Sequence, residues 1–275
     1  NQWNDWTAAG LPLDHAFNTN VHTELKNSWW FHAGITWGGV GDVFCDRCAR
    51  GGPALRTDQI ISAWSGFSGD ERKLILPELW FNYWQADEGR SHAVSLQPYV
   101  RFRLSSRMTM SSGLSLSRNR DDRQWFDNFT DPDGVTVHHT FAHLEQETAS
   151  LTGRLDITAT PTITLQVYAS PFITKGEYSN LRELNQPRAA NYDDRFMPYT
   201  AITDPGGFNF KEFRSNVVAR WEYRPGSALY LVWQQGRSDF EGERGDRSFR
   251  SDLNRLFDTH PNNTFLIKMS YWFDR

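Results

Sequence analysis

The sequence predicts an all-β protein, an antiparallel transmembrane β-barrel, and three observations lead to this fold class. The last stretch, residues 263–275, alternates at period two, with Phe265, Ile267 and Met269 on one face and Lys268 on the other. The same alternation recurs along most of the chain, and the connections between alternating segments are mostly short and long in turn. Barrel strands have lipid on one side and a wetter interior on the other, and outer-membrane barrels have short periplasmic turns and long external loops. A soluble β-sandwich is the alternative fold, but it has no reason to sort its loops by length.

Composition limits the functions to consider. The 275 residues carry a net charge of −4, which gives no reason to propose a nucleic-acid partner. Mean hydropathy is −0.62 and no run approaches about 18 consecutive apolar residues, so no transmembrane helix is predicted. Aromatic residues make up 15%, a content that fits interfacial girdles as well as sugar-binding surfaces. The opening residues NQWNDW do not resemble a signal peptide. Because an outer-membrane protein needs one, we expect the N-terminus to be a mature end or a cut inside a longer protein.

Four strands are expected in the N-terminal third of the chain. Residues 1–16 show no period and are interpreted as a loop. The strands after it are an extended segment at 17–26, a strand at 29–37 with alternating Trp, Phe, Ala, Ile and Trp, a strand at 55–63 with Leu, Thr, Gln, Ile and Ala in register, and an aromatic-rich strand at 72–85.

The fifth strand, after a hairpin at 86–91, shows the clearest alternation. Its apolar residues are Val94, Leu96, Pro98, Val100, Phe102 and Leu104, opposite Ser95, Gln97, Tyr99, Arg101 and Arg103. The remaining strands, each with apolar residues at every second position, are expected at 108–116 with a charged extension toward the turn at 131–134, then at 135–158, 163–169, 216–223, 229–233 and 263–273. Pro and Gly signals support the turns at 131–134 and 224–226.

Loop lengths and strand number together indicate how much of a barrel this chain contains. We interpret residues 1–275 as one barrel domain or barrel segment, with long external loops at 38–54, 119–135, 174–207 and 238–262. Eleven strands result, whereas bacterial single-chain barrels usually have an even number. Either a strand was miscounted or is hidden in residues 1–16, or the chain is the C-terminal part of a larger barrel. We favour the larger barrel.

Several segments resemble the bacterial domain-of-unknown-function family 5916. They are Arg50–Arg56 (RGGPALR), Leu165–Phe172 (LQVYASPF), Asn216–Gly226 (NVVARWEYRPG), Tyr230–Arg237 (YLVWQQGR) and Asn263–Trp272 (NTFLIKMSYW). The resemblance runs over nearly the whole chain, and the segment around Arg220–Gly226 is the most specific. It implies the C-terminal part of a longer protein, in which a carbohydrate-binding-module-9-like domain and further barrel usually come first. No catalytic motif is implied, although some members are labelled membrane-associated hydrolases.

Charged residues on the non-apolar faces of the predicted strands are the most informative site candidates. They are Arg101, Arg103, Arg154, Asp156, Arg220 and Glu222. Inside a barrel, such charges either pair with one another to hold the wall and a plug, or line a water-filled channel and select solutes. We predict that these six face the lumen, and the sequence leaves both roles open.

Other motifs are weaker. Cys45 and Cys48 form a single CxxC in a long loop, which in an oxidising compartment favours a local disulfide, with free thiols or a metal or redox role as alternatives. His138, His139 and His143 lie on one predicted strand, where exposed histidines are commoner than metal ligands. The nucleophile motif GxSxG is absent. We predict no metal site and no cofactor, and the catalytic residues of any enzyme are unknown.

The sequence therefore predicts a barrel in the outer membrane of a Gram-negative bacterium. The leading hypothesis is a channel, anchor or receptor at the cell surface. Its partners are the lipid bilayer and, through the external loops or the barrel edge, other protein chains or a carbohydrate ligand. The alternative is a membrane-associated hydrolase, which a Ser or Asp within hydrogen-bond reach of His139 or His143 would favour.

Overall fold

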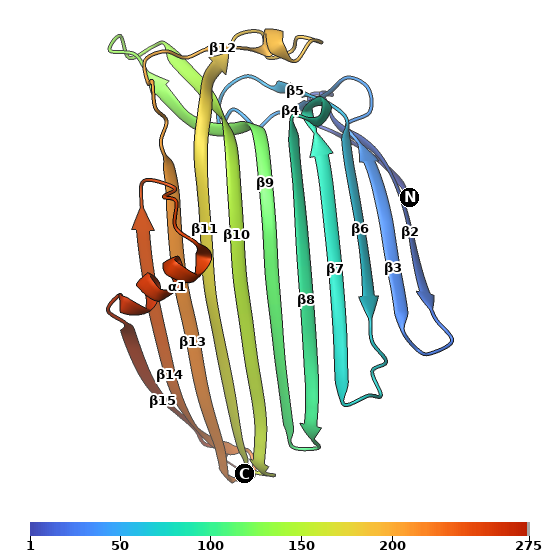
Figure 1. Cartoon of the computed structure of the whole chain (residues 1–275), viewed down its shortest axis with the longest axis vertical. Helices are drawn as coiled ribbons and strands as arrows, with labels where there is room; N and C mark the ends of the chain where they lie inside the picture. The colour runs from blue at the N-terminus through green and yellow to red at the C-terminus, as the bar shows by residue number, and fades with distance from the viewer. Residues whose placement is uncertain (274–275) are drawn as a thin grey trace.

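A computed structural model describes residues 1–273, and its fold is all-β (Figure 1). One large antiparallel sheet contains most of the chain. Its strands, in spatial and chain order, are β1 (Gln2–Trp6), β2 (Pro12–Glu24), β3 (Trp30–Gly38), β6 (Ile60–Ser68), β7 (Ile75–Ala86), β8 (Ser91–Ser105), β9 (Met108–Thr130), β10 (Val137–Thr160), β11 (Ile163–Leu184), β13 (Gly207–Arg224), β14 (Ser227–Glu241) and β15 (Asn262–Ser270). The fold class predicted from the periodicity is thus confirmed.

Short elements lie at the long-loop end of this sheet or, in the case of the helix, at mid-height against its C-terminal strands. They are the two-stranded sheet of β4 (Val43–Cys45) and β5 (Leu55–Thr57), β12 (Phe196–Pro198) paired with β11, the 3-10 turns η1 (Asp87–Gly89) and η2 (Asp193–Arg195), and the helix α1 (Phe249–Asp258). Among the described residues, neither α1 nor any other helix is long and apolar enough to cross a membrane.

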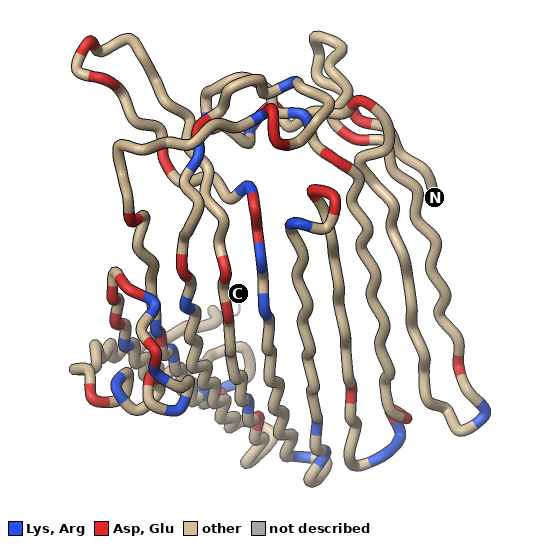
Figure 2. The backbone as a smooth tube through the Cα atoms, turned by 45° about the horizontal axis from the view of Figure 1, so that its top comes forward, with Lys and Arg blue, Asp and Glu red and all other residues tan. Residues whose placement is uncertain are grey.

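The sheet is open, because its two outermost strands, β1 and β15, do not pair with each other. Figure 2 shows that the C-terminal strands turn away behind the middle of the sheet. Helix α1 lies in front of these strands in Figure 1, so it sits on the convex side of the curved sheet.

The two faces of the sheet differ in chemistry. On the convex face, cross-strand neighbours such as Leu96 and Leu116, or Trp233 and Phe265, are apolar and exposed. The next residue along each strand points to the concave face, and the pairs there are polar, for example Ser95 with Ser117 and Gln234 with Thr264. Successive residues of a strand point to opposite faces, so the alternation read from the sequence becomes an apolar convex face and a polar concave face.

The apolar residues form a band across the strands rather than covering them completely. On β9 the band extends from Met108 to Leu116, about 26 Å at about 3.3 Å per residue, which is close to the height of about 25 Å of the apolar band of outer-membrane barrels. Beyond it, β9 continues to Thr130, and charged residues appear on both faces. In Figure 2 the charges gather on these upper strand segments, around α1 and at the short turns.

The structure corrects the expected boundaries. Residues 1–16, interpreted as a loop, contain β1 and the start of β2, and the large sheet has twelve strands in sequence instead of eleven. Residues 55–57 do not begin the third large strand but pair with β4 in the small sheet. Outside the apolar band neither face of a strand is continuously apolar, so the residues no longer alternate and the period disappears.

The expected long loops are correspondingly shorter. The loop at 119–135 is mostly the upper part of the β9–β10 hairpin, the first residues of 174–207 belong to β11, and 238–262 contains α1. The loop at 38–54 includes β4. The strands β9, β10 and β11 have 23, 24 and 22 residues, so they extend far beyond the apolar band.

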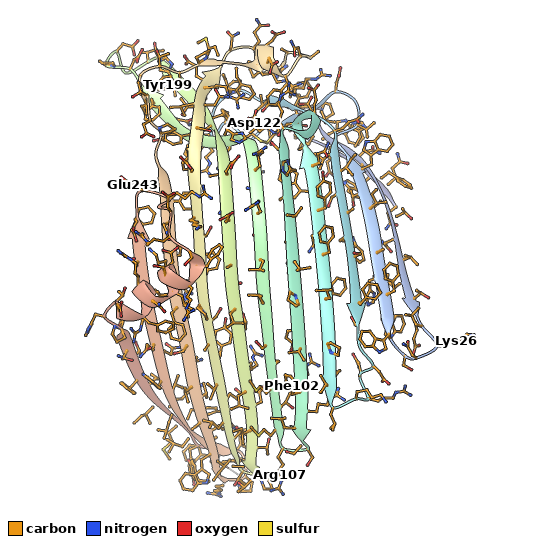
Figure 3. The ribbon with its side chains drawn as sticks, in the orientation of Figure 1. Lys26, Phe102, Arg107, Asp122, Tyr199 and Glu243 are labelled. Atoms are coloured by element: carbon orange, nitrogen blue, oxygen red, sulfur yellow. A yellow bond between two sulfur atoms is a disulfide. The ribbon has the colours of Figure 1, made fainter. Side chains whose placement is uncertain are left out.

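A compact cap closes the long-loop end of the sheet. It consists of residues 39–59 and 185–206 packed on the upper ends of β9–β11, at the top of Figure 1. Its core contains the buried side chains Ala49, Leu55, Phe141, Tyr192 and Phe196. Asp122 and Tyr199 mark this end in Figure 3, and Phe102 and Arg107 mark the short-turn end.

Candidate functional site

The polar concave face holds the charged residues singled out in the sequence. Antiparallel partners lie on the same face of a sheet, and the register therefore places these residues in rows. One row runs from Arg101 through Ser111 to Arg154, and on to Tyr168 and Asn216. The next row contains Arg103 and Asp156, and the one after that contains Arg220. All six candidates thus share one face, in the half of the sheet nearer the short turns.

These charges form local groups. Arg154 and Asp156 line a hollow of about 420 Å³ together with Gln166, Tyr168 and Asn216. The Gln166 amide donates to Asp156 at 3.1 Å, and the Arg154 guanidinium lies over the Tyr168 ring. This hollow is a water-accessible patch with both charge signs and an aromatic ring.

The other four candidates make separate contacts. Arg220 pairs with Glu222 at 2.7 Å and donates to the Tyr230 hydroxyl. Arg101 donates to the Tyr99 hydroxyl at 3.4 Å, and Arg103 donates to the backbone carbonyl of Glu71 in the neighbouring turn. Within residues 1–273, no ion pair joins Arg101 or Arg103 to the other candidates. The polar face thus combines locally paired wall charges with accessible hollows.

An aromatic cluster extends the polar face across β2, β3, β6 and β7. Trp64 lies flat over Gly34 and Trp80 over Gly66, so close that a Cβ at either glycine would lie within about 2.5 Å of the ring. His32 stacks on Trp80, with ring centroids 5.2 Å apart. The sequence signal was a glycine opposite a Trp on the next strand, which becomes visible only when the register is known. The rings form a flat platform on the same surface as the charges.

The cap is held by buried ion pairs between segments far apart in the sequence. Arg195, fully buried, binds both carboxylate oxygens of Asp58 at 2.7 and 2.8 Å and donates to the carbonyls of Ala189 and Ala190. Cys45 and Cys48 form a disulfide in the same region. The Arg195 contacts fix the two long connections against each other and the disulfide constrains the first of them, so the cap is a defined structure rather than a set of free loops.

Comparison with known proteins places this fold. The family described as Domain of unknown function (DUF5916) matches residues 7–275. The chain belongs to this family. No curated protein matches the sequence. The sheet of this DUF5916 chain is similar to the outer membrane transporter YddB from Escherichia coli, with a TM-score of 0.50 and 10% identity. The match covers 92% of this chain but 35% of the transporter, so the chain spans about a third of that protein's length.

The three histidines of β10 in the DUF5916 chain, His138, His139 and His143, lie near the cap. His143 Nδ1 is 2.8 Å from Asp122 Oδ1. An Asp within hydrogen-bond reach of His143 is the contact that would favour the hydrolase hypothesis. Asp122, however, also accepts from Tyr192 and Arg182. The other ring nitrogen of His143 lies 3.7 Å from a Glu145 oxygen instead of a hydroxyl. Asp122 is therefore a junction that joins β9, β10, β11 and the 185–206 segment.

Electrostatics agree with this structural role. Burial raises the pKa of the Asp122 carboxyl, but the Arg182 charge and the hydrogen bonds from His143 and Tyr192 outweigh burial and hold the pKa below its usual range. Burial also raises the pKa of the Tyr192 phenol, which keeps it a hydrogen-bond donor. His139 contacts Asn128, and His138 contacts Glu183. No group of three or more His, Cys, Asp or Glu side chains in the described part of the chain is arranged to hold a metal ion.

Proposed function

We propose that this chain forms part of the wall of a β-barrel channel in the outer membrane of a Gram-negative bacterium. The observation that carries the proposal is the separation of the two faces within the same strands. On β8 and β9, Leu96 and Leu116 are exposed on one face, and the adjacent Ser95 and Ser117 lie on the other. Apolar side chains exposed in such a continuous band are stable in lipid, and a polar face on the opposite side suits a water-filled interior.

The proposed channel is wider than this sheet alone. β1 and β15 are unpaired on their outer sides, and unpaired strand edges inside a bilayer are costly because lipid cannot satisfy their hydrogen bonds. We propose that further strands complete the wall between these edges. The similarity to one part of a transporter barrel supports this arrangement.

The charges and the ring platform on the concave face suggest the kind of solute. Arg154, Asp156 and Tyr168 offer both charge signs and a stacking surface, and Trp64 and Trp80 provide two more flat rings. Polar molecules with an apolar face, such as carbohydrates, suit this combination. The cap at the long-loop end is the part that would first contact such a ligand or a partner protein at the cell surface.

Conductance through planar bilayers tests the channel. The full-length protein, purified in detergent and reconstituted, should produce discrete ion currents. Arg154→Gln and Asp156→Gln should shift cation against anion selectivity in opposite directions because they remove opposite charges. Protein that floats with vesicles but passes neither ions nor sugars would contradict a channel and leave an anchor or receptor. A structure of the detergent particle, with strands counted around the closure, tests the wider barrel, and pairing of β15 with β1 would refute it.

A hydrolase is the second candidate, because His143 and Asp122 form a partly accessible pair. It requires a substrate group to reach His143 Nε2 beside Glu145. Hydrolysis of ester or glycoside substrates by the purified protein, lost in His143→Ala but kept in His139→Ala, would favour it. If neither variant changes turnover, the pair has only its structural role.

A further inference from the structure

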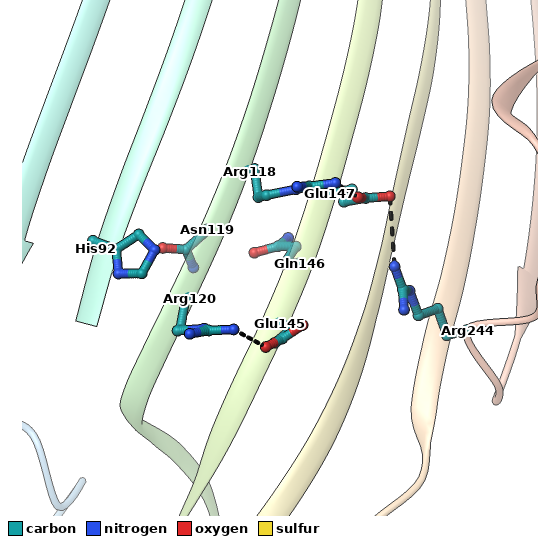
Figure 4. A pocket seen from close by; sticks show the side chains of 8 residues that line it. All are labelled: His92, Arg118, Asn119, Arg120, Glu145, Gln146, Glu147 and Arg244. Carbon is teal, nitrogen blue, oxygen red and sulfur yellow. Dashed lines mark hydrogen bonds and ion pairs between the residues drawn. The ribbon is translucent and has the colours of Figure 1, made fainter. Parts of the chain in front are cut away.

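Two adjoining hollows lie on the convex face at the upper edge of the apolar band. The lower hollow, about 460 Å³, is lined by Phe81, Val94, Leu96, Leu116 and Phe249. The upper one, about 300 Å³, is lined by His92, Arg118, Arg120, Glu145, Glu147 and Arg244 (Figure 4). Arg118 and Glu147 line both hollows. Together they form one groove with an apolar half and a charged half.

The strand register explains why the chemistry changes so abruptly. Leu96, Leu116 and Ala149 are cross-strand partners in one row. The next row on the same face, two residues further along each strand, contains Val94, Arg118 and Glu147, and the following row His92, Arg120 and Glu145. Adjacent rows on one face are about 7 Å apart along the strand. The surface of the groove therefore changes from apolar to charged between one row and the next.

The segment with α1 supplies the side wall of the groove. Phe249, the first residue of α1, faces the apolar half, and Arg244 reaches Glu147 at 3.6 Å in the charged half. A network anchors the segment to β13 and β14. The buried Lys211 binds Glu241 at 2.7 Å, Glu241 also pairs with Arg247, and the Asn209 amide donates to the buried Asp252 at 3.2 Å. The groove is thus built from residues separated by up to 168 positions, from Phe81 to Phe249, and held by a fixed scaffold.

The charged half favours an anionic ligand. It contains three arginines against two glutamates, a net charge of +1 with His92 neutral. Arg118 and Arg120 are 75% and 46% exposed, and each makes a single ion pair, to Glu147 and Glu145 respectively. A guanidinium has several N–H donors in a planar fork, so both can bind phosphate oxygens while keeping their glutamate partners.

We infer that this groove binds a phosphate-bearing membrane lipid whose headgroup has a net negative charge, with an acyl chain against Phe249 and Leu116 and the phosphate at Arg118, Arg120 and Arg244. The inference rests on the proposed function, since it requires the apolar band to lie in the bilayer. The height of the groove fits such a ligand, because its charged half begins where the apolar band ends. Lipid headgroups lie at this boundary, and their phosphates are recognised by basic pockets on membrane proteins.

Native mass spectrometry of the full-length protein in detergent tests the inference, with phosphatidylglycerol, lipid A and phosphatidylcholine as probes. The triple variant Arg118→Gln/Arg120→Gln/Arg244→Gln should bind phosphatidylglycerol and lipid A about 100-fold more weakly, since each interfacial arginine contributes about fivefold. Phosphatidylcholine, whose headgroup has no net charge, should bind weakly to both proteins. The matched control Arg101→Gln/Arg154→Gln/Arg220→Gln removes the same charge from the concave face and should bind the anionic lipids like the unmodified protein.

Each other outcome has a defined meaning. Unchanged lipid affinity in the convex-face variant overturns the inference, and so does inorganic phosphate that displaces the lipid at millimolar concentration, because the ligand is then free phosphate. Flotation with vesicles separates this result from the proposed function: protein that floats but binds lipid unselectively refutes only the groove, whereas protein that fails to float refutes the barrel. Should the triple variant not fold, Arg118→Gln, at an exposed side chain, should weaken binding about fivefold.

Discussion

The lower half of the sheet and the cap are built from one chain but place their apolar side chains in opposite ways. In the lower half, large apolar side chains point outward, and Phe265 and Ile267 are 75% and 73% exposed. In the cap, Phe141 and Tyr192 are almost completely buried. The cap carries its own hydrophobic core, as a water-soluble domain does, whereas the lower half exposes its apolar side chains, which the bilayer of the proposed function would cover. Changes that test this difference should therefore act on one region and spare the other.

Charges follow the same division. Arg195 in the cap is fully buried and every contact it makes is to the protein. On the concave face of the lower half, the Arg220–Glu222 pair is about one-third exposed, so water shares its interactions. A buried pair is costly to break because one charge is left without a partner, whereas an exposed pair contributes little.

The largest effect is expected at the buried pair of the cap. Arg195→Ala should destabilise the cap by about 3–5 kcal/mol, because it leaves the Asp58 carboxylate beside a cavity without its partner. Proteolysis of residues 185–206 under native conditions, compared with cleavage in the short turns, measures the local free energy. The matched control Arg220→Ala should change cleavage at neither end. Equal destabilisation of both halves would show that cap and sheet form one cooperative unit.

The next largest effect is expected inside the apolar band. Leu114→Arg places a charge near the middle of the lipid-facing side of β9 and should destabilise the protein in vesicles by about 2–4 kcal/mol. Ser115→Arg, one residue further and on the opposite face, should have an effect near zero. Urea unfolding of reconstituted protein, followed by tryptophan fluorescence, provides both values. If the two variants behave alike, β9 does not separate lipid from water.

How much could be predicted from the sequence also differs between the regions. An apolar face opposite a polar face forces alternation on residues such as Val94 to Leu104, so the strands of the lower half and the face of Arg101 and Arg154 follow from the period alone. In the cap, both sides of a segment contact protein or water, and no period results. Residues 55–57 were therefore assigned to the wrong sheet, and β1 was missed because it is short and its residues are all exposed.

The candidate sites divide in the same way. The sequence predicts that the individual charges lie on one polar face but not which of them meet, because partners depend on register. Arg195 and Asp58 are 137 residues apart, and no local pattern connects them. Helix α1 was also missed, because charged residues surround it and its few apolar positions resemble a solvated loop. The groove on the convex face combines both difficulties, since it joins strand rows to the α1 segment.

Reduction of the disulfide should have a smaller effect, confined to the cap. Cys45 and Cys48 close a very short loop, for which loss of the cross-link is expected to cost about 2 kcal/mol. Addition of a reductant should speed proteolysis of residues 39–59 and leave the urea midpoint of the band in vesicles unchanged. A Cys45→Ser/Cys48→Ser variant should match the reduced protein and show no further response to reductant. A shift of the vesicle midpoint would mean that the cap transmits its stability to the membrane strands.

The smallest effect concerns α1, which lies where the two regions meet, above the apolar band. The hydrogen bond from Lys211, with a further one from Arg247, holds the pKa of Glu241 at about 2, below its ordinary 4.5. A carboxyl with a depressed pKa stabilises the folded state above its unfolded pKa, and this contribution disappears as pH falls from about 4.5 toward about 2.

Pepsin, which is active in this range, should cleave residues 242–261 faster as the pH decreases. Pepsin should cleave the Glu241→Gln variant faster than the unmodified protein at pH 4.5, and this cleavage rate should depend less on pH. The Glu243→Gln variant, changed at an exposed neighbouring residue, should be cleaved like the unmodified protein at each pH. Because Lys211 is fully buried, loss of the Glu241 charge leaves it with Asp239, so α1 should loosen without the strands of the lower half separating. A pepsin cleavage rate that changes equally in both variants would assign the acid response to the general charge of the segment and not to this contact.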